Sequence, residues 1–304
     1  MLGDKGDLLE ITPLGNPSFL FWPNTVSGFP LPIANVNINP EILTDCIEIV
    51  RQVGAFQLQH FRKMPEGSDE VKAMRETVSF VDVESERMLR DGLLALIDSA
   101  GFYGEESGRS GSQQLVWVVD PLDGTTNYLS GLDQFSISVA LVEEKRPVLG
   151  LVYKPSTGEV YSCIKGQGVY HNGELTRPSH PGLTEKEALF MTGFPYRSPD
   201  VADGFFEAAA DILTMGRGIR RSGSAALDLA NLSMGWIQGF WETDLQPYDV
   251  AAGVLMMQEN GILVTNHRGE EYDMFKDRLI VAALPNVHAA LLAVVASTYK
   301  NSIE

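Results

Sequence analysis

VVDPLDGTTNY, which runs from Val118 to Tyr128, is the stretch that decides how the middle of this chain folds. An apolar run ends at Asp120, Pro121 interrupts the backbone, and Asp123 follows before a glycine, two threonines and an asparagine. An Asp-Gly pair after a strand is typical of a tight turn. A turn explains neither the aspartate that closes the apolar run nor the Thr-Thr-Asn tail, so the stretch needs a second interpretation.

Both carboxylates of this stretch are expected to reach the same place. Residues i and i+3 of a regular strand point to opposite faces, and a proline can break that alternation. Asp120 and Asp123 would then converge beyond the end of the strand. Two converging carboxylates repel each other unless a cation lies between them. The spacing therefore favours a metal site over a plain turn.

The same spacing excludes one class of phosphatase. Haloacid dehalogenase phosphatases carry Asp-x-Asp-Gly-Thr, in which the first aspartate is the nucleophile. The residue two places before Asp123 is Pro121, so that nucleophile is missing. No Gly-x-Ser-x-Gly sequence occurs either, which leaves serine hydrolase chemistry without support.

Two further acidic stretches lie at the ends of predicted elements. FYGEESG covers Phe102–Gly108, and FWETDLQPYDVAAG covers Phe240–Gly253, in which Asp249 opens a helix of small residues. An isolated aspartate at a helix start is by default an N-cap, and an exposed acidic loop is usually solvated, so neither stretch decides anything alone. Together the three stretches supply oxygen ligands and no histidine or cysteine, which indicates Mg²⁺ or Mn²⁺ rather than zinc.

The charge balance limits the expected partners. The chain has 304 residues, 44% of them hydrophobic, and a formal net charge of −17. This excess of acid disfavours nucleic acid and anionic membranes, whose binding needs clustered Lys and Arg, although acidity can also serve solubility alone. A protein of this charge that handles a phosphate needs another source of positive charge, and divalent metal is the obvious one.

Composition also predicts the compartment. The longest apolar runs fall short of the roughly 20 residues that span a bilayer. No basic segment followed by an apolar one opens the chain, so we expect no secretory signal. Cys46 and Cys163 are too few for a disulfide framework and suit a reducing compartment as buried small residues. We therefore expect a cytoplasmic protein.

Periodicity predicts the elements of the first part of the chain. Residues 1–38 show no sustained period and are expected to form an irregular N-terminal extension. Asn39-Pro40-Glu41 looks like the start of a helix that runs to about Lys63, and a second helix covers about Asp82–Ser99. The strands expected next, with a hairpin turn at His171–Glu174, are Leu115–Val119, Phe135–Val142, Val148–Lys154, Glu159–Ile164 and Val169–Tyr170.

Strands and helices alternate after Pro181. The strands expected there are Ala188–Thr192, Ile237–Trp241, Gly261–Val264 and Leu279–Ala282, and the helices are Asp203–Met215, Ala225–Met234, Val250–Asn260 and Asn286–Thr298. This mixture predicts an α/β or α+β protein with a meander sheet in the middle and helices layered around it. We expect the chain to divide at Arg177–Gly182, into halves at 39–180 and 181–304 after the extension 1–38.

Several motifs occur together and in a recognisable order. They are SFVDVESERML at 79–89, Glu-Glu-Ser at 105–107, Asp-Pro-Leu-Asp-Gly-Thr-Thr-Asn at 120–127, RRSGSAALDLA at 220–230 and Tyr-Asp-Val-Ala-Ala-Gly at 248–253. From about Ile42 to its end the chain resembles the inositol monophosphatase family of metal-dependent, lithium-inhibited phosphatases. The resemblance implies an αβαβα layered sandwich, the fold of inositol monophosphatase and fructose-1,6-bisphosphatase.

The resemblance also implies a set of metal ligands. It makes Glu105, Asp120 and Asp123 ligands of a first Mg²⁺ region, with the carbonyl of Leu122 as a further ligand. Asp249 would join the two aspartates around a second ion. Two or three Mg²⁺ ions are expected, with Mn²⁺ as an alternative.

Catalytic and substrate-binding residues follow from the same resemblance. Glu105 and Thr125 would orient and deprotonate the attacking water, and Asp82 would support Thr125 and the metal region. Gly124 and Thr125 would offer backbone N–H groups to the phosphate at the start of a helix. The full substrate-binding set is expected to be Asp123, Gly124, Thr125, Gly223, Ser224, Ala225, Glu242 and Asp249.

Substrate choice is expected to depend on the later motifs. Glu242 matches the family's glutamate that accepts hydrogen bonds from sugar or inositol hydroxyls, with an exposed strand-end acid as the alternative. Related nucleotide bisphosphatases carry Gly-Ser-x-x-Lys, and Leu227 stands at the lysine position, which favours a polyol phosphate. Gln246 and Tyr248 depart from the family's usual His or Lys and Trp. Arg220 and Arg221 fit a second phosphate or a dimer surface.

The expected activity is Mg²⁺-dependent hydrolysis of myo-inositol 1-phosphate, or a similar polyol or sugar monophosphate, by direct attack of water. The alternatives of the same fold are a fructose-1,6-bisphosphatase and a 3′(2′),5′-bisphosphate nucleotidase. A catalytically silent metal-binding scaffold is the alternative of another class, and the retained Thr125 speaks against it. The resemblance implies a homodimer and lithium sensitivity.

Overall fold

The computed structural model describes residues 38–63, 69–73, 76–178, 183–300 and 302–303, with the backbone alone for 69–73 and 76–79. Residues from Ile38 to Glu304 form one compact unit. The predicted extension lies outside the described residues apart from Ile38. The predicted division between 180 and 181 falls in the undescribed segment 179–182, so both of these remain predictions.

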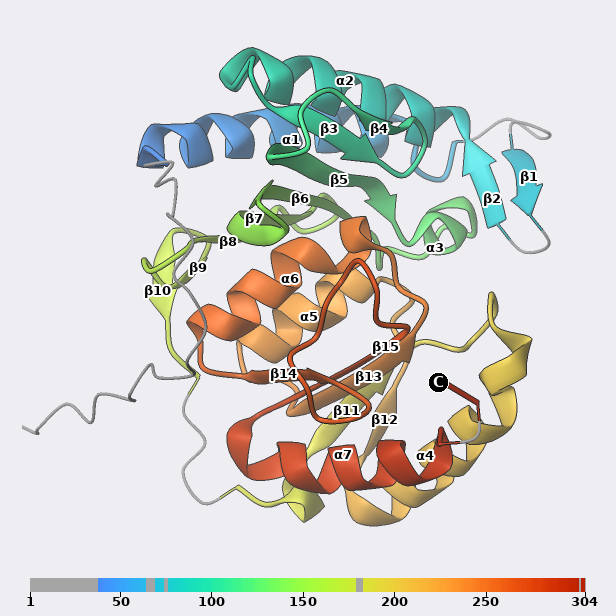
Figure 1. The fold of residues 1–304 in the computed structure, drawn as a ribbon. Helices are drawn as coiled ribbons and strands as arrows, with labels where there is room; N and C mark the ends of the chain where they lie inside the picture. The colour runs from blue at the N-terminus through green and yellow to red at the C-terminus, as the bar shows by residue number, and fades with distance from the viewer. Residues whose placement is uncertain (1–37, 64–68, 74–75, 179–182, 301, 304) are drawn as a thin grey trace, which may run out of the picture. The chain divides into compact units, whose positions relative to one another are not determined.

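The first sheet has eight strands, in the spatial order β10-β9-β8-β7-β6-β5-β3-β4 (Figure 1). Their bounds are β3 Gly101–Gly104, β4 Gly108–Ser110, β5 Leu115–Asp123, β6 Ser136–Glu143, β7 Arg146–Lys154, β8 Glu159–Ile164, β9 Val169–His171 and β10 Glu174–Thr176. All neighbours are antiparallel except β3 and β5. The predicted meander is therefore present as β5 to β10.

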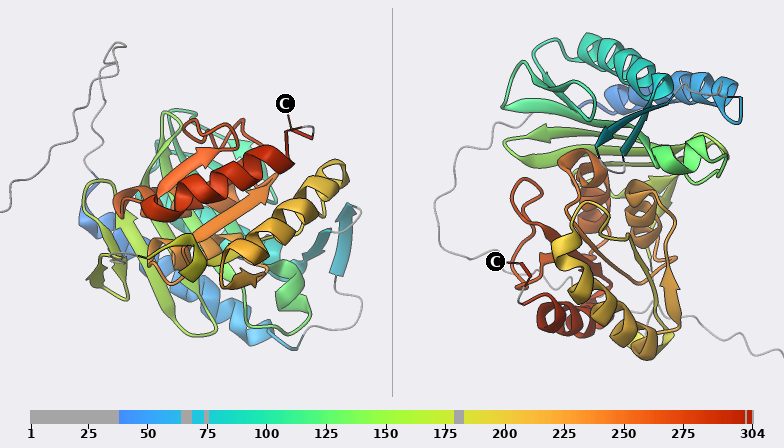
Figure 2. Two further views of the ribbon diagram at one scale, coloured as in Figure 1. Left: turned by 90° about the horizontal axis from the view of Figure 1, so that it is seen from below. Right: turned by 90° about the vertical axis from the view of Figure 1, so that its right-hand side faces the viewer.

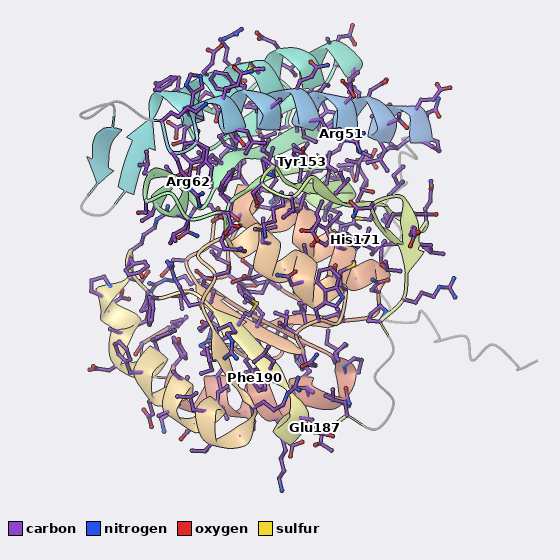
Figure 3. All side chains as sticks on the ribbon, turned by 180° about the vertical axis from the view of Figure 1, so that it is seen from behind. Arg51, Arg62, Tyr153, His171, Glu187 and Phe190 are labelled. Carbon is purple, nitrogen blue, oxygen red and sulfur yellow. The ribbon has the colours of Figure 1, made fainter. Side chains whose placement is uncertain are left out.

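Two helices, α1 Pro40–His60 and α2 Phe80–Leu96, lie side by side on the outer face of this sheet (Figure 1). The predicted start of α1 is confirmed, because the Asn39 side chain accepts a hydrogen bond from the backbone N–H of Glu41 at 3.1 Å and Pro40 is the first helical residue. The helix packs closely on β7: a Cβ on Gly54 would lie 2.5 Å from the ring of Tyr153, which Figure 3 labels.

The second sheet has five strands, in the order β12-β11-β13-β15-β14. Their bounds are β11 Leu189–Thr192, β12 Gly218–Arg220, β13 Gly239–Thr243, β14 Leu263–Asn266 and β15 Leu279–Ala283. Helices α5 Ala225–Ser233 and α6 Pro247–Glu259 lie between the two sheets, and α4 Ala202–Met215 and α7 Pro285–Thr298 cover the far face (Figures 1 and 2). The layers are αβαβα, which confirms the fold class.

Small residues let α6 fit between two sheets. Ala251, Ala252 and Gly253 are buried, and a Cβ on Gly150 of β7 would lie 2.9 Å from the Ala252 carbonyl oxygen. A Cβ on Gly253 would lie 2.5 Å from Leu229 of α5. The Val-Ala-Ala-Gly sequence after Asp249 therefore holds the start of α6 against the first sheet.

Several short elements were not predicted. They are a two-stranded hairpin, β1 Asp69–Ala73 with β2 Glu76–Ser79, and the strands β3, β4 and β12. The helix expected to start at Gly124 and Thr125 is present as α3 Thr125–Leu129. Strands of three to five residues carry too little periodicity to read, and they form because a neighbouring strand pairs with them. The predicted turn between β9 and β10 is confirmed, since Asn172 and Gly173 both have positive φ.

Two predictions about composition can also be checked. Cys46 and Cys163 are both buried and carry free thiols. Within the described ranges, no helix has both the length and the apolar character needed to cross a membrane.

Candidate functional site

The end of β5 brings its two aspartates to one place. The pairing of β5 with β6 is interrupted between Asp120 and Asp123, where Pro121 stands. Asp249 approaches from the first turn of α6, and ligand oxygens of the three aspartates all lie within 4.8 Å of one another. All three residues are buried. Segments far apart in the chain thus form one cluster of carboxylates, as the strand-end argument predicted.

Asp249 has two contacts that hold it in this cluster. Gln246 is the N-cap of α6 and Asp249 is its third residue, so the N-cap interpretation of Asp249 is wrong. The backbone N–H of Gln246 donates to Asp249 Oδ2 at 2.6 Å, in a capping box. The same carboxylate that caps the helix therefore also points at Asp120 and Asp123.

Crowding of carboxylates in a buried place raises their pKa values. Burial, followed by the charge of Asp123, raises the pKa of Asp249 to about 7. Burial and then the charge of Glu105 raise the pKa of Asp120 well above its usual value. The pKa of Asp123 is also raised by burial, although hydrogen bonds from Ser224, Ala225 and Ala226 work against the shift. Without a cation the charged forms are unfavourable.

These residues fit a hard divalent cation. The donor atoms are carboxylate oxygens only, they converge within one coordination shell, and burial leaves little water to screen their repulsion. Mg²⁺ usually binds one or two carboxylates and keeps several waters, so three aspartates supply enough carboxylates for at least one such ion. The carboxylate cluster could therefore hold a metal ion.

Glu105 lies in the turn between β3 and β4, at the border of the cluster. It is not one of the three acids whose oxygens meet within 4.8 Å. Burial raises its pKa to about 8, and the charges of Asp249 and Asp82 add to the shift. Its charge in turn raises the pKa of Asp120. The structure thus places Glu105 beside the cluster, close enough to interact with it electrostatically.

The turn that carries Glu105 is held by a residue to which sequence reasoning gave no role. Glu86 of α2 is 3% exposed and accepts hydrogen bonds from the backbone N–H groups of Glu106 at 2.7 Å and Ser107 at 2.8 Å. Gly104 permits this approach, because a Cβ there would lie 2.2 Å from Glu86 Oε2. The signal in the sequence was the acid one helical turn after Asp82.

Glu86→Ala is expected to lower kcat by about ten- to a hundredfold with little change in KM, because two backbone N–H groups lose their acceptor and Glu105 loses its position. Steady-state kinetics together with a melting curve would measure this. Glu84→Ala is the matched control, since Glu84 lies on the same helix and pairs with exposed Arg87 at 2.7 Å. Equal losses in both variants would contradict the positioning role.

Thr125 and Asp82 also meet beside the cluster. The Thr125 hydroxyl donates to the Leu122 carbonyl oxygen at 3.0 Å and lies 3.4 Å from Asp82 Oδ1. Asp82 is buried in the first turn of α2, one turn before Glu86. One helix therefore sets the positions of both Thr125 and the Glu105 turn.

Ser224 and Ala225 contact Asp123 directly. Ser224 Oγ donates to Asp123 Oδ2 at 2.5 Å, and the backbone N–H groups of Ala225 and Ala226 donate to the same carboxylate at 3.3 and 2.8 Å. Ser136 Oγ adds a longer contact of 3.4 Å. The start of α5 thus orients a carboxylate of the cluster; substrate contact by these residues remains a prediction.

Gly124 begins α3 in a conformation that favours glycine. Its φ is 96°, and a Cβ would lie 2.8 Å from the Gln134 carbonyl oxygen and 3.2 Å from that of Gly223. The first turn of a helix leaves N–H groups without partners inside the helix. The predicted phosphate contacts of Gly124 and Thr125 are compatible with this geometry and remain untested.

Glu242 of β13 also faces the cluster. Its pKa is raised well above its usual value by burial, then by the charges of Asp228, Asp249 and Asp123. A Cβ on Gly193 would lie 1.9 Å from its carboxylate, so glycine is needed beside it. The alternative of an exposed strand-end acid is wrong, because the side chain is half-buried within reach of the cluster's charges.

Two arginines flank these acids. Arg197, for which the sequence contained no signal, lowers the pKa values of Glu105 and Asp249 through its charge. Arg221 lies 5.2 Å over the ring of Tyr196 and lowers the pKa values of Asp228 and Glu242. Both guanidinium groups therefore add positive charge close to a strongly acidic site.

Comparison with known proteins gives this site a family. Residues 39–300 match the model of the Inositol monophosphatase family, and the chain belongs to that family of metal-dependent phosphatases. It is 34% identical over 262 residues to a putative Nus factor SuhB of Neisseria meningitidis, covering 86% of this chain and 99% of that protein. It is 31% identical over 249 residues to an inositol-1-monophosphatase of Caulobacter vibrioides, covering 81% and 97%.

Solved structures agree with the fold. An IMPase of Thermotoga maritima matches with a TM-score of 0.78 and 29% identity, over 86% of this chain and 99% of that one. The extragenic suppressor protein SuhB of Bartonella henselae matches with a TM-score of 0.79 and 30% identity, over 84% and 98%. The resemblance stated from the motifs is confirmed.

Proposed function

We propose that this protein is a Mg²⁺-dependent phosphatase that hydrolyses inositol monophosphate, or a similar polyol or sugar monophosphate, by direct attack of water. The observation that carries the proposal is the cluster of Asp120, Asp123 and Asp249, whose ligand oxygens converge within 4.8 Å. Such a site suits hydrolysis of a phosphate ester, whose negative charge repels a nucleophile. Two or three ions are proposed, with Mn²⁺ as a substitute.

The side chains around the cluster divide the work. Glu105, Asp120, Asp123 and Asp249 would hold the metal ions, with the Leu122 carbonyl as a further ligand. Bound divalent ions would supply the positive charge that acidifies water and offsets the charge of the phosphate. Glu105 would accept the proton of the attacking water, since its carboxylate lies beside the cluster, where burial and neighbouring acids raise its pKa.

Thr125 would aim the attacking water together with Glu105. Its hydroxyl is held between the Leu122 carbonyl and Asp82, so its oxygen lone pairs have a defined direction. The N–H groups of Gly124 and Thr125 would orient the phosphate. The water oxygen would bond to phosphorus as the ester P–O bond breaks, Glu105 would take the proton of the water, and the alcohol would leave after gaining a proton from solvent. Since no side chain attacks phosphorus, we expect no phosphoenzyme, and a phosphorylated Asp or Ser trapped during turnover would contradict this mechanism.

A substrate panel with Mg²⁺ tests the function. We expect phosphate release from myo-inositol 1-phosphate with a higher kcat/KM than from fructose 1,6-bisphosphate or 3′-phosphoadenosine 5′-phosphate. Repeating the panel with Li⁺ tests the proposed lithium sensitivity. Failure to hydrolyse any sugar phosphate, in protein shown to bind Mg²⁺, would favour the metal-binding scaffold; the relatives named Nus factor SuhB make that comparison worthwhile.

Glu242→Gln is expected to raise KM for inositol monophosphate by about tenfold. The substitution replaces one of the two carboxylate oxygens that would accept hydrogen bonds from substrate hydroxyl groups with an NH₂ donor. Hydrolysis of p-nitrophenyl phosphate, which lacks those hydroxyls, should change little, and the ratio of the two kcat/KM values is the measurement. Gly193→Ala should act in the same direction, since its Cβ would displace the Glu242 carboxylate. Parallel losses on both substrates would contradict the specificity role.

Fructose 1,6-bisphosphate is the second candidate substrate, and Arg221 favours it. The Arg221 guanidinium lies over the ring of Tyr196, and its charge lowers the pKa of Glu242. A second phosphate bound there would find positive charge at the edge of an acidic site. Arg221→Ala should then lower kcat/KM for the bisphosphate and leave inositol monophosphate nearly unchanged.

The remaining proposals rest on family membership. We propose that the protein is a cytoplasmic homodimer that binds a small phosphorylated polyol or sugar as its substrate and binds neither nucleic acid nor membrane. Size-exclusion chromatography with light scattering measures the oligomeric state, and a monomer at micromolar concentration would contradict the dimer.

A further inference from the structure

A cavity lies away from the carboxylate cluster. It has a volume of about 570 Å³, and none of Glu105, Asp120, Asp123 and Asp249 lines it. Its walls come from the β3–β4 hairpin, from β5 and β6, and from the loop before β15. Cavities of about 300–1,000 Å³ with mostly apolar walls and a few polar groups are the usual form of small-molecule sites.

The body of this cavity is apolar and aromatic. Val116, Val118 and Val142 form the wall on the sheet, and the rings of Phe102, Tyr103 and Phe275 also line the space. Val118 and Val142 are buried in the core between the two sheets, so that wall is rigid. A flat apolar group therefore fits this part of the cavity.

Charged groups of one sign line the same cavity. They are Arg109, Lys145 and Lys276, and no Asp or Glu among the described residues belongs to the lining. Lys276 forms an ion pair with Asp273 at 3.1 Å, and Arg109 and Lys145 still give the lining a positive charge. The Arg109 guanidinium lies 4.4 Å over the Tyr103 ring and 5.2 Å over that of Phe275. In a chain of net charge −17, this is a local reversal of sign.

We propose that this cavity binds a small amphipathic organic anion, with a planar apolar body among the rings and valines and a carboxylate, sulfonate or phosphate near Arg109. Arg109 is the residue that would contact both the apolar body and the anionic group of such a ligand. It stacks on the aromatic wall and presents hydrogen-bond donors in a fork that matches planar or tetrahedral oxyanions.

The cavity touches the elements that position the carboxylate cluster. β3 ends at Gly104 and β4 begins at Gly108, so the hairpin that lines the cavity carries Glu105 in its turn. The Tyr103 ring also meets the ring of Tyr248, the neighbour of Asp249, with centroids 5.7 Å apart. β4 is the edge strand of its sheet and pairs on one side only.

A ligand in the cavity is therefore expected to act on catalysis through the β3–β4 turn. This second half of the proposal rests on the proposed phosphatase activity, whereas binding itself does not. A ligand that contacts Tyr103 and Arg109 would favour one position of the β3–β4 turn over another. The position of Glu105, which lies in that turn, would change with it. Differential affinity for two positions of the turn is what couples the two sites.

Anilinonaphthalene sulfonate, an aromatic anion with a planar naphthalene ring, is the probe for binding. Titrated into the full chain with Mg²⁺, it should show saturable binding at one site by fluorescence and calorimetry. Val116→Phe, which fills part of the cavity, and Arg109→Glu should each weaken binding by at least about tenfold. Arg217→Glu, an exposed charge reversal beside the second sheet, is the matched control and should bind as the wild type does.

Melting curves and circular dichroism show whether each variant is folded, and a calorimetric stoichiometry distinguishes one site from many weak ones. Binding that is equal in the wild type and in folded Val116→Phe and Arg109→Glu would overturn the cavity proposal. If Val116→Phe fails to fold, Arg109→Glu decides alone, because its side chain is on the surface.

The coupling is measured on the same proteins. Saturating probe should change kcat of the wild type by at least about twofold and leave that of Arg109→Glu unchanged. Probe bound at one cavity-dependent site with no effect on kcat would overturn the coupling. A protein that hydrolyses no phosphate ester would refute the proposed function, while the binding data would still decide the cavity site.

Discussion

Asp123→Asn is expected to lower kcat by at least about a thousandfold, the size commonly lost with a catalytic group, while leaving the fold intact. The carboxylate is one of three whose oxygens converge within 4.8 Å, and an amide cannot replace its charge. The amide oxygen can still accept hydrogen bonds from Ser224 and Ala226, which hold Asp123 in the native structure. Steady-state kinetics at saturating Mg²⁺ and far-UV circular dichroism are the two measurements.

Glu259→Gln is the matched control for Asp123→Asn. Glu259 is the last residue of α6, and its carboxylate accepts hydrogen bonds from the backbone N–H groups of Gly166 and Gly168, away from the cluster. We expect it to keep near wild-type kcat. Activity of Asp123→Asn close to that of the wild type would show that Asp123 is not a metal ligand in the catalysed reaction.

Removing divalent metal is expected to make the protein less stable as pH rises. Burial and Asp123 raise the pKa of Asp249 to about 7, and burial with Asp249 and Asp82 raises that of Glu105 to about 8. A carboxyl whose folded-state pKa exceeds its unfolded value binds more protons when folded. The free energy of unfolding therefore decreases as pH rises from the unfolded-state pKa to the folded-state pKa. Tm of the metal-free protein should accordingly decrease from about pH 5 to about pH 8.

Mg²⁺ should reverse this loss. A ligand that binds only the folded state, at about one hundred times its Kd, adds about 2.7 kcal/mol to the free energy of unfolding. The gain should be greatest at high pH, where the carboxylates are ionised and repel one another. Melting curves in chelator and in Mg²⁺, measured across this pH range, give both quantities.

Asp249→Asn provides the internal control for the pH experiment. It removes one of the repelling charges, so the metal-free variant should melt above metal-free wild type at about pH 8. It should also lose most of the response to Mg²⁺, since one of three ligands is gone. A wild-type Tm that rises with pH in chelator, or an unchanged Mg²⁺ response in this variant, would refute the idea that these acids share one cation.

Local sequence was enough where the chain's own geometry decides the outcome. Pro121 predicted the irregularity between the two aspartates: β5 extends beyond the predicted end at Val119 to Asp123, and its pairing with β6 is interrupted between Asp120 and Asp123. Asn172 and Gly173 predicted a hairpin because both residues tolerate positive φ, which they adopt. Asn39 and Pro40 predicted the start of α1 by the capping that is observed.

Contacts between segments that are far apart in the chain could not be predicted from local sequence. The bonds of Glu86 to the Glu105 turn depend on how α2 lies over the hairpin, and β3 and β4 are too short to show a period. The hydrogen bonds from Ser224 and Ala225 to Asp123 also had no local signal, because they form only where α5 begins beside the end of β5. Arg197 belongs to no motif, and only proximity gives it a role.

The sequence by itself determined which residue types stand at strand ends and helix starts, and so the oxygen chemistry of the site and the mixture of helices and strands; the order of the layers was implied by the family resemblance. Those properties depend on neighbours along the chain, through proline geometry, capping and periodicity. Only the tertiary structure decided that three aspartates share one buried space, that their pKa values rise, and that a positively lined cavity adjoins the Glu105 hairpin. Electrostatic repulsion and cavity shape depend on distances through space, which no local pattern contains.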